Sequence, residues 1–306
     1  MRCLIAFVGP TAVGKSAVAT KIAKQYSGDI INADSRQIYK YMDIGTAKPG
    51  TEERESVVHH LLDIIYPDES YSVALYQRSA NELITSIHCS DRLPVLVGGS
   101  GQYVWSVIEG WQIPEVEPDI DYRQSLEKEA EKLGQESLYS RLLEIDPVAA
   151  GKILPGNIRR VIRALEIYKQ TGIQPSKLQT KNGLPYPVLI IGLTASRDIL
   201  YELIDKRVDL MIKAGFVEEV QKLLSMGYSA DLPSMSSLGY GQIASYLKGE
   251  ISLIDAVQKI KYETHRFARS QYTWFRLKDS RIQWFDVNDD ISSKINYTIK
   301  TFLEAV

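Results

Sequence analysis

The sequence predicts an α/β fold in which a mostly parallel sheet carries helices on both faces, with a helical insertion between two strands. Three observations support this prediction. Short apolar runs without polar alternation recur along the chain, amphipathic helical patterns separate them, and one long stretch shows helical patterns alone. Apolar runs of this kind are typical of strands that are buried on both faces of a parallel sheet.

Each expected strand is followed by turn residues. The apolar runs predict strands at Cys3–Val8, Asp29–Ala33, Pro94–Val97, Val188–Gly192 and Ile282–Asp286. Between them, the amphipathic patterns predict helices at Lys15–Tyr26, Ser72–His88, Ile199–Met226 and Ser292–Leu303. The pair His59-His60 is expected at a strand edge. This alternation indicates strands that are joined by covering helices.

One stretch departs from the alternation. Residues 114–181 show only helical patterns, and acidic side chains dominate their first half while basic ones dominate the second. The sequence therefore predicts a catalytic core formed by residues 1–113 and 182–306. Residues 114–181 are expected to form an inserted helical domain, which we interpret as a lid or arm.

Bulk composition limits the classes of function. The chain has 306 residues and a formal net charge of -2, so any nucleic-acid site must concentrate positive charge locally. Its two cysteines, Cys3 and Cys89, lack partners at metal-ligand spacing and are expected to be inert core thiols in a reduced compartment. No run of 18 apolar residues is present, so no membrane span is expected. The expected location is the cytoplasm.

A phosphate-binding loop follows the first expected strand. The run matches G-x-x-x-x-G-K-[ST], with Gly9, Pro10, Thr11, Ala12, Val13, Gly14, Lys15 and Ser16. Its glycines let backbone N–H groups point at one phosphate chain, and the following helix adds its positive dipole end. Lys15 offers a point charge to a phosphate, and the Ser16 hydroxyl suits Mg²⁺. The fold class is therefore refined to a P-loop kinase-like parallel sheet flanked by helices.

The third expected strand ends differently from the corresponding strand of motor or switch NTPases. Those proteins place an acidic metal ligand at the end of a second apolar strand, whereas Pro94–Val97 leads into the sequence GGSGQY. This ending favours a kinase-like enzyme or a transferase that uses a diphosphate. The glycines could serve a tight turn or the close approach of a substrate, and the sequence leaves both readings open.

Polar residues end the second expected strand. Asp34 should face the same cleft as the phosphate loop, because ligands bind outside the carboxyl ends of parallel strands. A carboxylate there can act as general base or hold a metal through water. Gln37 carries donors and an acceptor that suit an adenine edge. Alternatively, Asp34 caps a helix and Gln37 lies on a solvated face.

Taken together, these runs resemble the tRNA dimethylallyltransferase (IPP transferase) family. The likeness rests on GPTAVGKS at 9–16, NADSRQIYKYMDIGTAKP at 32–49, GGSGQY at 98–103, RRVIRALE at 159–166 and SLGYGQ at 237–242. It implies transfer of a dimethylallyl group from dimethylallyl diphosphate to N6 of the adenosine 3′ of the anticodon, with release of diphosphate and a need for Mg²⁺. It also implies the tRNA anticodon stem-loop as a partner, and a monomer.

The resemblance assigns roles residue by residue. Catalytic roles fall to Asp34 as general base, Thr11 and Arg207. The donor diphosphate is expected on Gly9–Ser16 and Arg207, with Mg²⁺ at Ser16. Expected tRNA contacts are Asp34, Ser35, Arg36, Gln37, Ser100, Arg123, Arg159, Arg160 and Arg163.

Two departures from the family pattern limit the assignment. Residues 99–101 read Gly-Ser-Gly where Gly-Thr-Gly is expected, which keeps the hydroxyl, and residues 264–271 redistribute basic charge. Individual tRNA contacts of Arg266 and Arg269 are therefore not assigned. Without the resemblance, Arg207 would be read as a surface ion pair. The run Arg159–Arg163 could equally be a solvated face or serve the donor phosphates.

Three other functions compete with this one. An adenylate prenyltransferase would share the phosphate loop and Asp34 but would have little use for basic helices and an insertion. A small-molecule kinase would place ATP on the loop and use Asp34 to deprotonate an alcohol. A non-catalytic RNA-binding module would give no reason for Lys15, Ser16 and Asp34 in one cleft.

Overall fold

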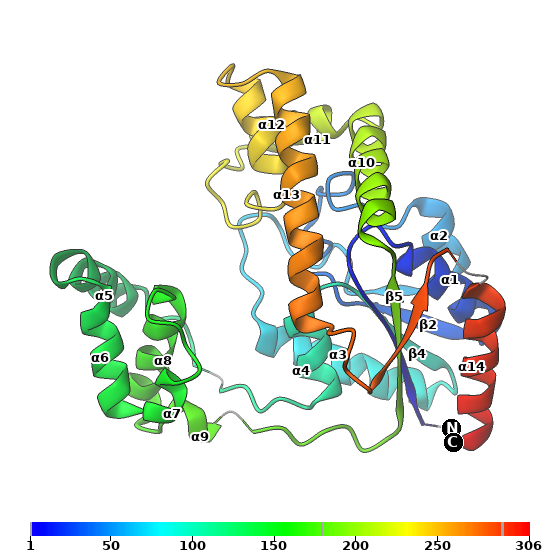
Figure 1. The fold of residues 1–306 in the computed structure, drawn as a ribbon, viewed down its shortest axis with the longest axis horizontal. Helices are drawn as coiled ribbons and strands as arrows, with labels where there is room; N and C mark the ends of the chain where they lie inside the picture. The colour runs from blue at the N-terminus through cyan, green and yellow to red at the C-terminus, as the bar shows by residue number, and fades with distance from the viewer. Residues whose placement is uncertain (1, 115, 179, 289–290) are drawn as a thin grey trace. The chain divides into compact units, whose positions relative to one another are not determined.

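The computed structural model describes residues 2–114, 116–178, 180–288 and 291–306. The chain folds into two compact units (Figure 1). The core unit comprises Met1–Ile108 and Leu184–Val306, and the insertion unit comprises Glu109–Gly183. The sequence placed the corresponding boundaries at residues 114 and 181.

The core unit is built on a six-stranded sheet in which every pair of neighbouring strands is parallel. The spatial order is β3-β2-β4-β1-β5-β6. The strands are β1 (Leu4–Val8), β2 (Gly28–Asn32), β3 (His59–His60), β4 (Leu93–Val97), β5 (Val188–Thr194) and β6 (Ile282–Asp286). All residues of β1, β2 and β4 are buried, as the unbroken apolar character of β1 and β4 predicts, and β2 also buries Asp29 and Asn32. The five expected strands and the expected edge position of His59-His60 are confirmed.

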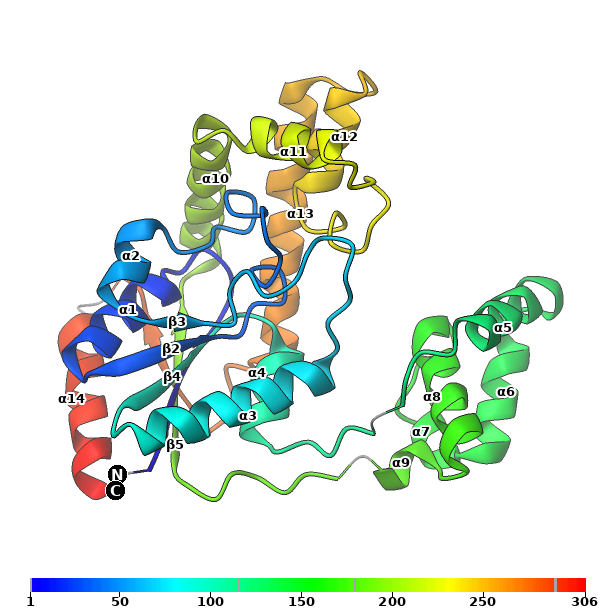
Figure 2. The same cartoon turned by 180° about the vertical axis from the view of Figure 1, so that it is seen from behind.

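Helices cover both faces of this sheet. The helices of the core unit are α1 (Lys15–Gln25), α2 (Thr51–Ser56), α3 (Val73–Cys89), α4 (Gly101–Ile108), α10 (Arg197–Lys213), α11 (Phe216–Ser225), α12 (Tyr240–Leu247), α13 (Leu253–Trp274) and α14 (Ile291–Ala305). Figures 1 and 2 show α1 and α14 on one side of the sheet and α3 with α4 on the other. The helices α10–α13 pack on one another as a further layer. The P-loop α/β fold class is confirmed.

The expected single helix at Ile199–Met226 is wrong. The structure contains two helices, α10 and α11, which are separated at Ala214 and Gly215. Gly215 has a φ of 99°, which lies in the left-handed region and ends an α-helix. The apolar period continues across the break, which is why periodicity alone did not reveal it.

The described part of the insertion unit consists of helices and connecting loops, with an isolated antiparallel β-bridge between Trp111 and Lys181. It contains α5 (Ile120–Leu133), α6 (Gln135–Ile145), α7 (Pro147–Ala150), α8 (Ile158–Thr171) and α9 (Pro175–Leu178). Its own core includes Leu126, Leu142 and Leu165 from α5, α6 and α8. Because it buries an apolar core of its own, the insertion is a separate helical unit rather than a surface loop.

One expectation about the cysteines is wrong. Cys3 is buried, but Cys89 is exposed at the end of α3. The buried residues of α3 recur at helical spacing and end with Ile87, so a residue two positions later falls on the opposite side of the helix. In the described part of the chain, no helix combines the length and apolarity that crossing a bilayer needs.

Candidate active site

The phosphate loop lies between the end of β1 and the start of α1. Gly9 has a φ of 132°, and a Cβ at this position would lie 2.2 Å from the Leu193 carbonyl oxygen, so both backbone angle and space require glycine. Gly14 precedes the first turn of α1 with a φ of 82°. The loop therefore presents backbone N–H groups and a helix N-terminus to the same space, as anion binding requires.

The surroundings of the Lys15 side chain disfavour its charged form. Its Nζ donates a 2.7 Å hydrogen bond to the Pro10 carbonyl. Burial and, to a smaller extent, the nearby Arg207 guanidinium together lower the pKa of Lys15 to about 7, while the Asp34 carboxylate opposes the shift. An arriving anion would oppose this shift, because its negative charge favours the charged form of Lys15.

This pKa predicts that diphosphate binding takes up a proton. At about pH 8.5 most Lys15 side chains in the free cleft are neutral, and a bound anion restores the charged form. Because inorganic diphosphate itself titrates in this range, uptake is compared with that of Lys15→Met: we expect close to one additional proton per diphosphate at this pH and almost none at about pH 6, where Lys15 is already largely charged. Titration calorimetry in two buffers of different ionisation enthalpy measures the uptake. Equal additional uptake at both pH values would contradict the assignment.

Asp34 follows β2 and is held by a local turn. Its backbone N–H donates to the Asn32 Oδ1 at 3.1 Å, and its Oδ1 accepts from the Arg36 N–H at 2.9 Å. No helix begins here, since the following residues form bends and turns, so the helix-cap alternative is wrong. The carboxylate is fixed through one oxygen, which leaves the other for the cleft.

One cleft brings the two halves of the expected site together. It contains about 590 Å³ of empty space, part of it open to solvent. The phosphate loop contributes Thr11, Lys15 and Ser16, the segment after β2 contributes Asp34, and α10 contributes Arg207. The carboxyl ends of β1, β2 and β4 meet along this edge, because neighbouring strands of the sheet are parallel.

Arg207 is not the surface ion pair that its sequence context suggests. It lies on α10, it is half-buried, and it lines the cleft with Lys15 and Asp34. Burial lowers the pKa of Arg207, and the Asp34 carboxylate opposes this shift. The two cations and the one carboxylate therefore act on one another electrostatically within the cleft.

Three residues near Asp34 are engaged within the chain. Gln37 donates from its Nε2 to the Thr46 and Ala47 carbonyls, at 3.1 and 3.0 Å, so its Oε1 is what remains for a ligand. Ser35 and Ser100 are paired with each other: the Ser35 N–H donates to the Ser100 Oγ at 2.9 Å. The contact between Ser35 and Ser100 joins the segments that follow β2 and β4.

Arg36 is also held by the chain. Its guanidinium donates a 3.0 Å hydrogen bond to the Pro233 carbonyl. The contact bridges the segment after β2 and the segment before α12, which are far apart in the sequence. A structural role is therefore shown for Arg36, and its expected contact with tRNA stays a prediction.

Packing explains the glycines that follow β4. A Cβ on Gly98 would lie 2.1 Å from the Ala33 carbonyl oxygen, one on Gly99 would lie 2.2 Å from the Gln271 Nε2, and one on Gly101 would meet the Trp274 ring. The expected close approach of a substrate stays a prediction, because the crowding at these glycines comes from within the protein. The approaching groups belong to the chain itself.

Sequence reasoning missed Gln271, a buried residue at the end of α13. Its Oε1 accepts from the Thr11 N–H at 2.8 Å, and its Nε2 donates to the Gly99 carbonyl at 2.9 Å. It thus ties the phosphate loop to the segment after β4. The glutamine stands at the end of the 264–271 run, which departs from the family pattern in its basic residues but keeps the final glutamine, and that match was the available signal.

The four expected tRNA-binding arginines of the insertion fall into two pairs. Arg123 and Arg163 both pair with the fully buried Glu166, at 2.8 and 2.5 Å. They neutralise a buried carboxylate, which is a structural role. Arg159 and Arg160 are exposed at the start of α8 and are the stronger candidates for backbone contacts.

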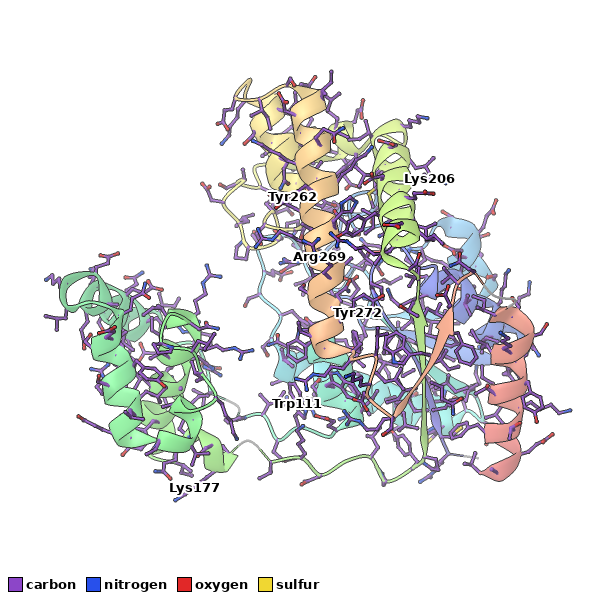
Figure 3. The ribbon with its side chains drawn as sticks, in the orientation of Figure 1. Trp111, Lys177, Lys206, Tyr262, Arg269 and Tyr272 are labelled. Atoms are coloured by element: carbon purple, nitrogen blue, oxygen red, sulfur yellow. The ribbon has the colours of Figure 1, made fainter. Side chains whose placement is uncertain are left out.

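The basic residues of the 264–271 run lie on α13. Figure 3 labels Tyr262, Arg269 and Tyr272 along this helix. The Arg269 guanidinium donates to the Tyr201 hydroxyl, and the Tyr272 hydroxyl bonds the Thr194 Oγ1 at 2.7 Å. Tyr262 and Arg266 are exposed. The helix therefore mixes residues that anchor it to α10 and β5 with residues that face solvent.

The donor groups in the cleft fit a Mg²⁺ ion. The Ser16 hydroxyl and the Asp34 carboxylate both line it. In the described ranges, no group of three or more His, Cys, Asp or Glu side chains could form a dedicated metal cage. Mg²⁺ prefers oxygen ligands and is commonly held by one or two protein groups together with substrate phosphates and water. This donor set is of that kind.

The fold and the cleft define a P-loop enzyme of the α/β class, and comparison with known proteins gives the family. The profile described as IPP transferase matches residues 37–278, and one described as isopentenyl transferase matches residues 2–66. The chain is 51% identical over 273 residues to a tRNA dimethylallyltransferase of Roseiflexus castenholzii, covering 89% of each. It is 48% identical to one of Dehalococcoides mccartyi, covering 98% of this chain and 92% of that one.

Solved structures agree with these sequence matches. The tRNA isopentenylpyrophosphate transferase of Bacillus halodurans is 43% identical, with a TM-score of 0.73, covering 100% of this chain and 96% of that chain. A eukaryotic dimethylallyltransferase acting on tRNA is 27% identical, with a TM-score of 0.82, covering 95% of this chain and 75% of that chain. The chain belongs to the IPP transferase family of prenyltransferases.

Proposed function

We propose that this chain transfers the dimethylallyl group of dimethylallyl diphosphate to N6 of the adenosine 3′ of the anticodon in tRNA. The names of its relatives support a dimethylallyl donor and a tRNA acceptor. The single observation that carries the mechanism is the cleft itself. In it, a phosphate cradle with Lys15 and Arg207 meets one carboxylate, Asp34.

The acceptor half of the reaction needs a base. An exocyclic amine is a poor nucleophile, so removal of its proton as the C–N bond forms lowers the barrier. In the proposed step, N6 bonds to the allylic C1, the C1–O bond breaks, and the N6 proton passes to the Asp34 carboxylate. The turn formed with the Asn32 side chain and the Arg36 amide holds this carboxylate in place.

The leaving-group half needs positive charge. Diphosphate departs readily when its developing charge is neutralised, and the loop amides, Lys15 and Arg207 supply that neutralisation. Thr11 lines the cleft beside them, with its backbone N–H fixed on Gln271. When bound, Mg²⁺ at Ser16 adds further charge to the diphosphate oxygens.

The allylic carbon also needs protection from water, because it develops positive charge as the diphosphate leaves. Ile30, Leu62 and Val97 line the same cleft as the charged residues. Their apolar surfaces suit the hydrocarbon chain of the donor. The target adenosine must leave its stack to reach such a cleft, as it does for other enzymes that act on a base.

The insertion is proposed to grip the tRNA backbone through Arg159 and Arg160. We expect Arg160→Ala to weaken tRNA binding and to reduce the slope of log affinity against log salt by about one unit, because one phosphate contact is lost. Filter binding over a salt series measures both quantities. Arg141→Ala is the matched control, since Arg141 in the same unit is paired with Glu129 at 3.2 Å. An unchanged slope in Arg160→Ala would remove this residue from the interface.

A single assay separates the proposed function from its rivals. The protein is incubated with Mg²⁺ and labelled dimethylallyl diphosphate, with unmodified tRNA, AMP or no acceptor. Label on tRNA is the expected result. Label on AMP would identify an adenylate prenyltransferase, and phosphate release from ATP without prenyl transfer would identify a kinase. We further propose that the enzyme acts as a monomer, as the family likeness implies, and that it is located in the cytoplasm, as the sequence composition suggests.

A further inference from the structure

The structure contains a carboxylate, Glu219, that binds a loop of the cleft wall. Residues 43–49, here called the 43–49 loop, follow the Asp34 segment, and Ala47 and Pro49 from this loop line the cleft. The Thr46 and Ala47 carbonyls also accept the two hydrogen bonds of Gln37. The position of this loop therefore sets the shape of the cleft on the side of Asp34.

The loop is not in a relaxed conformation. Within the loop, Ala47 adopts a φ of 47°, and just before it Tyr41 adopts a φ of 66°, both in the left-handed region that non-glycine residues rarely occupy. Backbone of this kind persists only where surrounding contacts hold it. Gly45 shows how tight those contacts are, because a Cβ there would lie 2.2 Å from the Phe216 ring and 2.6 Å from the Tyr240 ring.

Glu219 on α11 holds the first residues of the loop, while Gln37 and Lys48 hold its later part. The Glu219 Oε2 accepts from the Asp43 and Ile44 N–H groups at 2.9 and 2.7 Å, and its Oε1 accepts from the Gly45 N–H at 3.1 Å. The Tyr240 hydroxyl donates to the same Oε1 at 2.7 Å. One half-buried carboxylate thus receives three consecutive backbone donors and one phenol.

Tyr240 belongs to the SLGYGQ run, whose purpose the phosphate chemistry leaves unexplained. Its side chain is fully buried, and its ring packs edge-on against Phe216 with centroids 5.0 Å apart. The SLGYGQ run therefore contributes Tyr240 to the surroundings of the Glu219 carboxylate. The 43–49 loop, the start of α11 and the start of α12 meet at Glu219.

We propose that Glu219, supported by Tyr240, is a positioning residue that fixes the 43–49 loop as the wall of the acceptor side of the cleft. The inference rests on the proposed function in that it assigns the loop to the acceptor rather than to the diphosphate. Glu219 acts through the loop and Gln37, and it touches neither the phosphate loop nor Asp34 in the contacts that define it. Loss of the hydrogen bonds between Glu219 and the 43–49 loop should therefore impair prenyl transfer while leaving diphosphate binding intact.

The test compares Glu219→Gln with Glu218→Gln. Both substitutions remove one negative charge from the first turn of α11, and Glu218 is exposed. A glutamine at 219 directs its NH₂ group at one or more of the backbone donors in either amide orientation, so it cannot hold all three. Hydrogen exchange of the Asp43–Gly45 amides, kcat and KM for tRNA prenylation, and the Kd for inorganic diphosphate with Mg²⁺ are measured for each variant.

For Glu219→Gln we expect faster exchange at Asp43–Gly45 and a kcat lower by roughly 10- to 100-fold, as displaced binding groups produce. The Kd for diphosphate should stay within about twofold of that of Glu218→Gln, since none of the phosphate-binding groups is moved. Exchange and kcat equal to those of the control would overturn the proposal. A parallel loss of diphosphate affinity would overturn it too, because the residue would then support the whole cleft.

Tyr240→Phe replaces the first variant if Glu219→Gln fails to fold. This variant deletes one hydrogen bond to the Glu219 carboxylate, and we expect its kcat to be lower by roughly 3- to 10-fold. A kcat and an exchange rate equal to those of the unmutated chain would contradict the proposed role of Glu219. The exchange measurement needs no substrate. If the unmutated chain places no label on tRNA, the proposed function fails, and the exchange comparison still decides whether Glu219 holds the loop.

Discussion

Asp34→Ala is expected to lower the turnover of tRNA prenylation by roughly 100- to 10,000-fold, the range that general-base catalysis contributes. The reason is that Asp34 is the acidic side chain that lines the cleft together with Lys15 and Arg207. Affinity for tRNA should remain nearly unchanged, because binding of the backbone depends on basic side chains elsewhere. Single-turnover kinetics with saturating tRNA, together with filter binding, separate the two quantities.

Asp34→Asn is the matched control for the geometry of this site. Its Oδ1 can still accept the Arg36 N–H that the aspartate accepts at 2.9 Å, so the local turn is kept. The asparagine cannot take a proton from N6. A large loss in both variants points to the base, whereas near-normal turnover in either would show that the base is another group.

Lys15→Met is expected to lower kcat/KM by roughly 100- to 1,000-fold, as removal of a single group that stabilises developing charge does in other enzymes. Methionine keeps much of the length of the lysine side chain but carries no charge. Loss should appear both in diphosphate affinity and in turnover, because the diphosphate is more negative as it leaves than in the bound donor. Lys24→Met on the same helix is the control, since Lys24 is exposed. Equal kinetics for the two variants would exclude Lys15 from the leaving-group site.

The parts of the site that the sequence revealed are those set by local spacing. Gly9, Gly14, Lys15 and Ser16 lie within one strand–loop–helix unit, where the chain itself dictates which groups face the ligand. Asp34 could be placed because it ends a buried strand, and parallel strands bring their carboxyl ends to one edge. Arg207 came only from the family likeness, since nothing in the pattern of α10 distinguishes it from a surface residue.

The parts that the sequence did not reveal depend on long-range contacts. Gln271 bonds Thr11 and Gly99, which are 260 and 172 positions away in the chain, and no local pattern encodes such a pairing. Glu219 likewise reaches back to residues 43–45. The pairing of Arg123 with Glu166, 43 positions away, was missed for the same reason. Arg163 and Glu166 are three positions apart on one helix, but the sequence did not show that Glu166 is buried rather than exposed to solvent.

A crystal structure of the protein with dimethylallyl thiolodiphosphate and Mg²⁺ tests the central claim most directly. The account predicts that the diphosphate oxygens lie on the amides of Gly9–Ser16 with Lys15 and Arg207, and that the allylic C1 faces the Asp34 carboxylate. A diphosphate bound outside this cleft, or a prenyl chain directed away from Asp34, would contradict it.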